Sequence, residues 1–190
     1  MKKEIFKKNT DEKDWKLYES AFIKAIRRCN VDDALYWATR LFILGKVDLI
    51  WRRIWIHLSE DIGLANEILP STIESLYQNY NRLSVKGDTS YESDDACKLP
   101  LFHAVMLLAK SPKSREVDSA MIVHFYTDQT REVPDYCIDI HSPKGRRLGR
   151  GVDHFFQEAG KIENEVKVFP NDFYTLRAYT YLRNLETDSK

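Results

Sequence analysis

The chain has 190 residues and 29 basic and 29 acidic side chains, so its formal net charge is zero. A chain of this length can build one hydrophobic core with room for a small addition. Hydrophobic residues make up 43% and charged residues 31%, which is typical of globular rather than disordered proteins. Because the whole molecule carries no net charge, any attraction to nucleic acid has to come from a local basic patch.

The sequence shows no sign of membrane, secretory or metal-binding segments. The longest apolar stretch, residues 99–109, contains His103 and is too short to span a bilayer core of about 30 Å. The N-terminal MKKEIFKKNTDEKDWK lacks the apolar region of a secretory signal. The three cysteines (Cys29, Cys97 and Cys137) are far apart and form no CxxC pair, which indicates reduced thiols. We therefore expect a cytoplasmic protein with no membrane segment, no metal and no cofactor.

Four helices are predicted in the first part of the chain, where apolar residues recur three or four positions apart. They cover residues 15–28, 33–44, 47–62 and about 65–83. Asn30 and Asp32 are candidate N-caps of the second helix, and Gly45 and Gly63 end the second and third. The third helix has a wide apolar stripe, which favours a place deep in a bundle. Pro70 requires a kink or a restart in the fourth.

The rest of the chain alternates between helices and irregular segments. Residues 86–98 are predicted to form an exposed acidic loop, and 99–110, apolar nearly all round, a central buried helix. Ser111 and Pro112 match the N-cap and first position of a further helix over residues 113–127. Helical periodicity then fails over residues 133–151, with a weak strand possibility at 136–140. Helices are expected again at 152–161 and 173–185.

The predicted fold is therefore all-α: a helical bundle followed by a looped basic segment near the C-terminus. We expect a charged tail over residues 1–14 and a helical domain over 15–130. Residues 131–190, with the basic segment and the last helices, are expected to pack on that same domain.

Two stretches, SAFIKAIRRCNVDDALYWATRLF (20–42) and RRIWIHLSEDIGLAN (52–66), resemble the C-terminal region of a known family. This is the replication-associated recombination protein A family, the MgsA/RarA-type AAA+ ATPases, related to the Werner-helicase-interacting proteins. LLAKSPKS (107–114) resembles a helix junction of the same family. The resemblance is specific over residues 18–125 and weaker afterwards. The family's motif positions fall here on Ser20, Ala21, Phe22, Lys24, Arg27, Asp32, Ala34, Leu35, Tyr36, Trp37, Arg52, Arg53, Ser59, Glu60, Asp61, Gly63, Leu64 and Ala65.

The resemblance implies an α-helical collar that, in the family, forms homotetramers and supports DNA engagement at stalled replication forks. The family's ATPase region lies N-terminal to this part. The sequence contains neither GxxxxGKS nor GxxxxGKT, so it has no phosphate-binding loop for a nucleotide. We therefore expect a non-catalytic module. Its expected partners are further copies of itself, as a tetramer by resemblance, DNA or other nucleic acid, and, alternatively, a separate AAA+ ATPase.

The motif residues are expected to serve the architecture of the bundle. Glu60 and Asp61 end the third predicted helix, and we expect them to form an ion network with Arg52 and Arg53, about two turns earlier. The spacing of Tyr36 and Trp37 places them among core positions rather than on a base-stacking surface. Ser20, Lys24 and Arg27 belong to the same structural set.

The strongest functional candidate is the basic segment DIHSPKGRRLGRGVDH (139–154). Lys144, Arg146, Arg147 and Arg150 are predicted to bind phosphates of a nucleic-acid backbone, because guanidinium groups match phosphate geometry. Glycines in the segment let backbone N–H groups turn toward an anion. The supporting residues are His141, Gly145, Gly149, Gly151, Asp153 and His154.

Four other interpretations of the basic segment stay open. It can be a solvated loop, or an intramolecular partner of the acidic residues 88–95. It can also dock an acidic partner protein, which would make the chain an adaptor. The fourth possibility is catalytic: Asp139, His141, Asp153 and His154 can form a metal-assisted or acid–base site for phosphodiesters.

Overall fold

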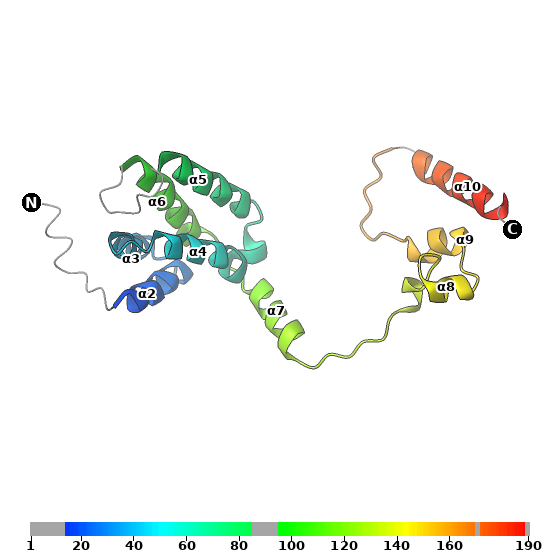
Figure 1. Cartoon of the computed structure of the whole chain (residues 1–190), viewed down its shortest axis with the longest axis horizontal. Helices are drawn as coiled ribbons and strands as arrows, with labels where there is room; N and C mark the ends of the chain where they lie inside the picture. The colour runs from blue at the N-terminus through cyan, green and yellow to red at the C-terminus, as the bar shows by residue number, and fades with distance from the viewer. Residues whose placement is uncertain (1–13, 85–94, 170–171, 189–190) are drawn as a thin grey trace, which may run out of the picture. The chain divides into compact units, whose positions relative to one another are not determined.

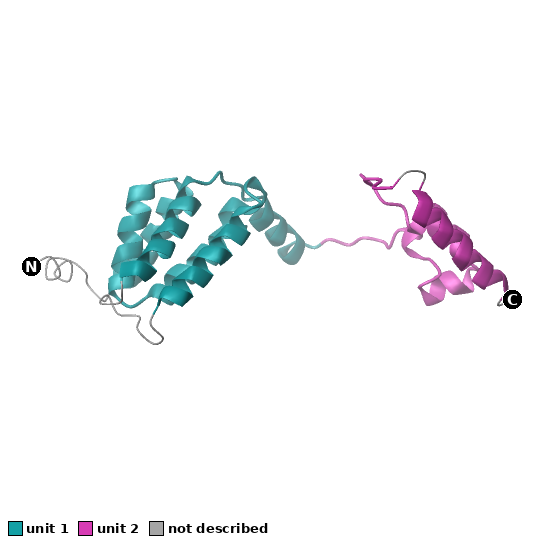
Figure 2. Cartoon of the chain, turned by 90° about the horizontal axis from the view of Figure 1, so that it is seen from above, with its two compact units in different colours: residues 1–128 teal, residues 129–190 magenta. Residues whose placement is uncertain are grey.

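The computed structural model describes residues 14–84, 95–169 and 172–188 (Figure 1). Every regular element in these residues is helical and none is a strand, which confirms the predicted all-α fold. The chain divides into two compact units, Met1–Asp128 (unit 1) and Gln129–Lys190 (unit 2), which Figure 2 colours separately. In the described ranges, no helix combines the length and the hydropathy that a membrane crossing requires.

Unit 1 is a helical bundle organised around one central helix. Helix α6 packs against α2, α3, α4 and α5, so the predicted central helix is confirmed. A π-helical turn, η2 (Leu58–Ile62), and a 3-10 turn, η3 (Gly63–Ala65), connect α4 to α5. The α-helices described in unit 1 are α2 (Trp15–Arg27), α3 (Val31–Ile43), α4 (Val47–His57), α5 (Leu69–Leu83), α6 (Asp95–Lys110) and α7 (Glu116–Tyr126).

The core of unit 1 consists of the apolar residues that the helical period of the sequence places on one face of each helix. Phe22 of α2, Ile54 of α4 and Leu101 of α6 are all fully buried. Burying one such side chain contributes about 1.5–3 kcal/mol. Two expectations were wrong in detail: Leu99 of α6 is 72% exposed, and Tyr36 of α3 is 47% exposed. Helix α6 therefore has an open face, and Tyr36 lies outside the core.

The ends of α3 form as the sequence predicts. The side chain of Asn30 accepts a hydrogen bond from the Asp33 N–H at 3.1 Å, so Asn30 is the N-cap. After the helix, Gly45 adopts φ +68°, and the N–H of Lys46 reaches back to the carbonyl of Leu41 at 2.9 Å. This is a Schellman motif, in which a glycine takes the left-handed conformation that ends a helix.

The third predicted helix, 47–62, is α-helical only to His57 and finishes as the π-turn η2. Gly63, at φ +49°, then ends it. The fourth predicted helix begins at Leu69 rather than near residue 65, with Pro70 in its first turn, where a missing N–H costs nothing. Of the predicted acidic loop 86–98, residues 95–98 are the first turn of α6 and the earlier part lies outside the described residues.

Ser111 and Pro112 do not start a helix, contrary to prediction. The Ser111 hydroxyl accepts a hydrogen bond from the Asn66 amide at 3.0 Å, so it is not free to cap a helix. The Lys113 ammonium turns back and donates to the carbonyls of Leu108 and Ala109 at the end of α6, at 2.9 and 3.2 Å. Positive charge and donors at a helix C-terminus are stabilising, so this segment closes α6, and α7 begins only at Glu116.

Unit 2 contains short helical turns and one longer helix. Its elements are the 3-10 turn η4 (Asp135–Cys137), α8 (Pro143–Arg147), α9 (Val152–His154), the π-turn η5 (Phe155–Ala159) and α10 (Phe173–Asp188). The weak strand considered at 136–140 is absent, since η4 occupies its beginning. Helix α10 packs against α9, where the Glu186 carboxylate accepts from the Val152 N–H at 3.2 Å. Val152 is the one apolar side chain among the described residues of unit 2 that is classed as buried.

Candidate nucleic-acid interface

The basic segment of unit 2 is a short helix, not the loop that the sequence suggested. Ser142 is its N-cap and accepts a hydrogen bond from the Gly145 N–H at 3.0 Å, and Pro143 occupies the first turn. Gly149, at φ +71°, ends the helix, and the N–H of Arg150 reaches the carbonyl of Gly145 at 3.0 Å. A capped N-terminus and a Schellman C-terminus fix this turn, so its basic side chains project from a defined backbone.

Gly145 serves close packing rather than anion binding. It is buried, and a Cβ at this position would overlap the main-chain carbonyl of Asp139. Its N–H is already committed to Ser142, and the Gly149 N–H donates to the carbonyl of Arg146 at 3.0 Å. The expectation that the N–H groups of these two glycines turn toward an anion was therefore wrong.

Arg150 is paired inside unit 2. Its guanidinium donates to the two carboxylate oxygens of Asp135 at 2.7 and 2.6 Å and to the carbonyls of Asp135 and Ile138 at 2.8 and 2.6 Å. The hydrogen bond from Arg150 holds the pKa of Asp135 below its ordinary value. This arginine joins η4 to the end of α8, and its charge is balanced by a carboxylate.

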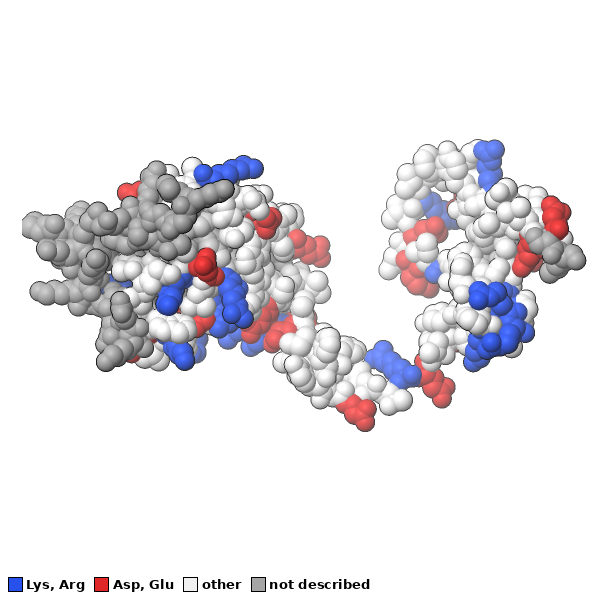
Figure 3. Space-filling view, in the orientation of Figure 1, with Lys and Arg blue, Asp and Glu red and all other residues white. Residues whose placement is uncertain are grey.

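The other three basic residues form no salt bridge with a carboxylate of the described residues. Arg146 donates to the carbonyls of Ile140 and His141 at 3.0 and 3.2 Å, which holds the side chain without neutralising it. Lys144 and Arg147 are exposed, and no carboxylate of the described residues pairs with either. Figure 3 shows basic side chains gathered on the visible face of unit 2. Three cations on one fixed turn are a natural site for a polyanion.

The proposed hydrolytic cluster is not assembled in one place. Asp139 accepts from the backbone N–H of His141 at 3.0 Å and contacts its Nδ1 at 2.8 Å, and this contact lowers the pKa of Asp139. Asp153 instead accepts from Tyr179 and Arg183 of α10, each at 2.7 Å. His154 has a buried Nδ1 without a hydrogen-bond partner. Asp139 and His141 thus pair with each other, and Asp153 binds α10, so these residues hold unit 2 together at separate places.

The motif residues of unit 1 form an ion network, but with partners other than those expected. Arg27 of α2 donates to Asp61 at 2.9 Å and to Glu60 at 2.6 Å. Arg115, just before α7, donates to Glu60 at 3.2 Å and lies 3.7 Å from Asp61. Arg53 instead pairs with Glu19, so the predicted pairing of the two acids with Arg52 and Arg53 was wrong.

Asp61 is the buried centre of this network, with 2% of its side chain exposed. Its carboxylate also contacts Nδ1 of His57, and burial lowers the pKa of His57 below its ordinary value. The carbonyl of Asp61 accepts from the Ser114 N–H at 2.8 Å. The network therefore connects α2, η2 and the start of α7. Arg115 was missed because it lies 55 residues from Glu60 in the sequence. His57 was missed because it lies outside the motif, although its spacing of four residues from Asp61 was a signal for the contact.

The remaining motif residues are packing groups. Lys24 donates to Ser20 one turn earlier. Trp37 is half-buried and stacks on Tyr18, with ring centroids 5.5 Å apart. Tyr36 packs edge-on against Trp37 and lies under the guanidinium of Arg40, 4.8 Å from its ring centroid. Arg52 is exposed.

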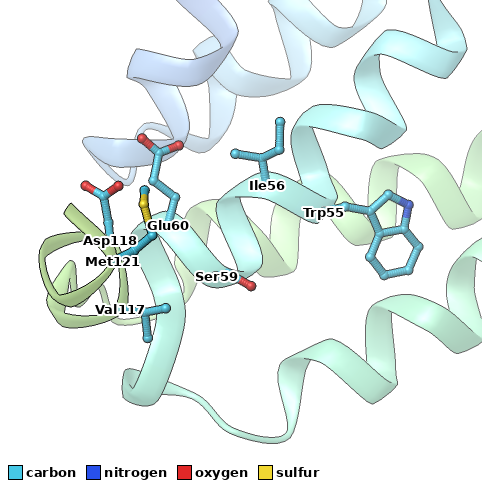
Figure 4. Close-up of a pocket in the computed structure, with 7 residues that line it drawn as sticks. All are labelled: Trp55, Ile56, Ser59, Glu60, Val117, Asp118 and Met121. Atoms are coloured by element: carbon cyan, nitrogen blue, oxygen red, sulfur yellow. The ribbon is translucent and has the colours of Figure 1, made fainter. Parts of the chain in front are cut away.

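A groove of about 530 Å³ lies beside this network in unit 1. Its walls come from the end of α4, from η2 and from α7, as Figure 4 shows. This groove was not predicted, since it forms between residues 55–60 and residues 117–121, which are far apart in the sequence. The lining residues are Trp55, Ile56, Ser59, Glu60, Val117, Asp118 and Met121.

Comparison with known proteins agrees with the helical architecture. The family model described as "MgsA AAA+ ATPase C terminal" matches residues 29–187. The chain therefore belongs to the MgsA-type AAA+ ATPase C-terminal family.

Among curated proteins, replication-associated recombination protein A of Bacillus subtilis (strain 168) is 30% identical over 139 residues. That alignment covers 71% of this chain and 31% of the relative. An uncharacterised AAA domain-containing protein of Mycobacterium tuberculosis is 35% identical over 103 residues, covering 54% of this chain and 21% of the relative. The chain thus spans less than a third of either relative and corresponds to the C-terminal part of such ATPases.

Proposed function

We propose that this chain is a non-catalytic module of replication and recombination, which self-associates and holds a nucleic-acid backbone on unit 2. The family assignment supports the cellular role, because a replication-associated recombination protein is among its relatives. The match to the C-terminal part of AAA+ ATPases supports a role in binding rather than nucleotide hydrolysis.

The observation that carries the nucleic-acid part is the fixed basic turn α8. Lys144 and Arg147 are exposed and have no carboxylate partner among the described residues, and Arg146 is held in place by main-chain carbonyls. Contacts of this kind bind the backbone irrespective of sequence and weaken as salt displaces them. Arg150, in contrast, serves the structure of unit 2, so we leave it out of the binding set.

A salt series tests this proposal directly. Binding of labelled single-stranded and forked DNA, and of single-stranded RNA, is measured for the natural chain and for a Lys144→Glu/Arg147→Glu variant. The matched control is Lys161→Glu/Lys167→Glu, which makes the same change in net charge at two lysines that pair with Glu158 and Asp172. Losing two phosphate contacts should reduce the slope of log affinity against log salt by about 1.4 for single strands.

The control variant should bind as the natural chain does. If both double variants lose affinity equally, the effect is one of overall charge and α8 is not the site. If the Lys144→Glu/Arg147→Glu variant binds all three nucleic acids unchanged at low salt, the nucleic-acid role is refuted.

A second candidate is partnership with an AAA+ ATPase, which the match to the C-terminal part of such ATPases favours. In both relatives the matched region is a minor part of a longer chain, and one of them is named as an AAA domain-containing protein. Affinity purification of the tagged chain from its own cells, followed by mass spectrometry, should recover an AAA+ protein in stoichiometric amount if this partnership is correct. Recovery of the chain alone would count against it.

A further inference from the structure

His141 lies just before α8 and adjoins the basic side chains of that helix. Its carbonyl accepts a hydrogen bond from the Arg146 guanidinium at 3.2 Å, which brings that cation against the main chain of His141. The His141 side chain is 70% exposed, and Lys144 follows three positions later in the chain. A nucleic-acid backbone that contacts Arg146 therefore passes close to the imidazole of His141.

Two contacts hold the His141 ring in one orientation. Nδ1 lies 2.8 Å from one carboxylate oxygen of Asp139, and the other oxygen accepts the backbone N–H of His141 at 3.0 Å. The ring also packs edge-on against Phe155 of η5, with the ring centroids 5.2 Å apart. A side chain that is already held loses less rotamer freedom when a ligand binds, so it makes a better contact than a free one.

The pairing with Asp139 decides which nitrogen of the ring can meet a ligand. The hydrogen bond from His141 holds the pKa of Asp139 below its ordinary value, so this carboxylate is ionised in neutral solution and acts only as an acceptor. Nδ1 therefore carries a proton in both charge states of the ring, and Nε2 gains or loses the other proton. Without that proton Nε2 is an acceptor, whereas with it the ring offers a phosphate a charged N–H donor.

Two charged groups of the described residues are in contact with His141, and they act on its ring in opposite directions. The Asp139 carboxylate attracts a protonated ring, and the Arg146 guanidinium repels it. A phosphate bound at Arg146 would offset that repulsion, so a bound nucleic acid favours the protonated ring. The other charged side chains of α8 and η5 are Lys144, Arg147 and Glu158.

We infer that His141 is a further phosphate contact of the basic turn, made only when its ring is protonated, so that nucleic-acid binding by unit 2 strengthens as pH falls. This inference rests on the nucleic-acid binding proposed above, and it adds a residue and a pH dependence to that binding. Histidine is the side chain whose charge ordinarily changes between pH 5 and 8, so the effect falls in that range. By thermodynamic linkage, binding must in turn take up a proton.

A pH series on the full chain tests the inference. The affinity for a labelled single-stranded oligothymidylate, whose bases do not titrate in this range, is measured at pH 8 and pH 5.5 over several salt concentrations. The natural chain should bind about 3- to 10-fold more tightly at pH 5.5. Its slope of log affinity against log salt should be steeper there by up to about 0.7, the value for one more phosphate contact on a single strand.

Three variants separate the causes of a pH effect. His141→Gln is polar but takes up no proton, so it should bind at both pH values as the natural chain binds at pH 8. His141→Arg has a permanent charge and should bind at both pH values as the natural chain binds at pH 5.5. The matched control, His124→Gln at an exposed position of α7, should keep the full pH effect. Circular dichroism melting checks that each variant keeps its fold.

A second measurement detects the proton itself. Titration calorimetry at pH 6.5, in two buffers with different ionisation enthalpies, gives the number of protons that the complex takes up as it forms. The natural chain and His124→Gln should each take up part of one proton, and His141→Gln should take up none at this site. A purely structural role of His141 would leave the proton uptake of the His141→Gln chain the same as that of the natural chain.

Each outcome bears on a different claim. A natural chain that binds equally at both pH values, or a His141→Gln chain that keeps the pH effect, overturns the role of His141 while the other basic residues of α8 stand. Equal loss of affinity at both pH values in His141→Gln would instead make the ring a stacking surface for bases, and also overturns the charged contact. A natural chain that binds at neither pH refutes the nucleic-acid binding itself.

Discussion

Units 1 and 2 are held together by different forces. Unit 1 has a continuous hydrophobic core, to which α2 through α6 all contribute. In the described part of unit 2, Val152 is the one buried apolar side chain, and hydrogen bonds connect the helical elements to one another. Arg150 joins η4 to α8, Glu186 joins α10 to α9, and Asp153 binds Tyr179 and Arg183.

The difference explains why the candidate site lies in unit 2. A basic turn in a large apolar core would need its charges compensated, since buried unpaired charge is strongly unfavourable. In unit 2 the short helix α8 is fixed by its caps and by main-chain contacts, so Lys144 and Arg147 stay in water. Unit 1 supplies the hydrophobic core, and unit 2 presents charge.

The largest effect is expected from the buried carboxylate of unit 1. Asp61→Ala leaves the buried His57 ring without its carboxylate partner and takes from Arg27 one of its two carboxylates. Removing one member of such a pair costs about 3 kcal/mol or more, or roughly 10 °C in melting temperature for a domain of this size. Calorimetry should show this loss, while Asp48→Ala, at an exposed position of α4, should change little.

The division of roles between the two units would be wrong if the Asp61→Ala variant melted at the same temperature as the natural chain but no longer bound nucleic acid. In that case the ion network would be a binding site and not part of the scaffold.

An intermediate effect is expected at the packing contact of unit 2. A helix-interior glycine replaced by alanine normally gains about 0.5–1 kcal/mol. Gly145→Ala should instead lose about 1–3 kcal/mol, because its Cβ would overlap the Asp139 carbonyl. Gly149→Ala should lose roughly 1 kcal/mol from its positive φ alone, since nothing lies near its Cβ position. Amide exchange in α8 measures both, and a Gly145→Ala chain better protected than the natural one would contradict the packing.

The smallest effect is a difference in pH response between the units. Burial lowers the pKa of His57 below 6.5, so the unfolded chain takes up a proton that folded unit 1 resists. The stability of unit 1 should therefore fall as pH drops below about 6.5, by at most about 1.4 kcal/mol per pH unit. The pKa values of Asp135 and Asp139 are lowered from 3.8, so their contribution to unit 2 is lost only below about 3.8.

Amide exchange between pH 7 and 4.5 should show unit 1 weakening first. In a His57→Gln chain this pH dependence should flatten, whereas His124→Gln, at an exposed position of α7, should keep it. If unit 2 lost its amide protection at a higher pH than unit 1, the assignment of the pH response to His57 of unit 1 would be wrong.

The fold of unit 1 was largely predictable because its elements obey local rules. The helical spacing of apolar residues is visible in the sequence, and so are the N-cap Asn30 and the terminating Gly45 of α3. All of these features occur in the structure. The π-turn η2 was not predictable from periodicity, because it interrupts the 3.6-residue repeat. The late start of α7 was missed because Ser111 and Lys113 make tertiary contacts with Asn66 and α6 in place of capping a helix.

The candidate site was predictable in composition but not in conformation. The sequence identified Lys144, Arg146 and Arg147, yet the segment was expected to be a loop. The signals of a helix were present: Ser142 and Pro143 at the start and Gly149 at the end. No sequence rule indicated that Asp135 would neutralise Arg150. The two residues are 15 positions apart in the sequence, and only the fold of unit 2 brings them together.

The central claim is that nucleic acid contacts unit 2 through α8. Backbone NMR spectra of the ¹⁵N-labelled full chain, titrated with a short single-stranded DNA at low salt, test it most directly. The largest shift changes should fall on residues 142–150 and should disappear as salt is raised. Changes concentrated on α2, α3 or the α7 groove, with residues 142–150 unmoved, would contradict it.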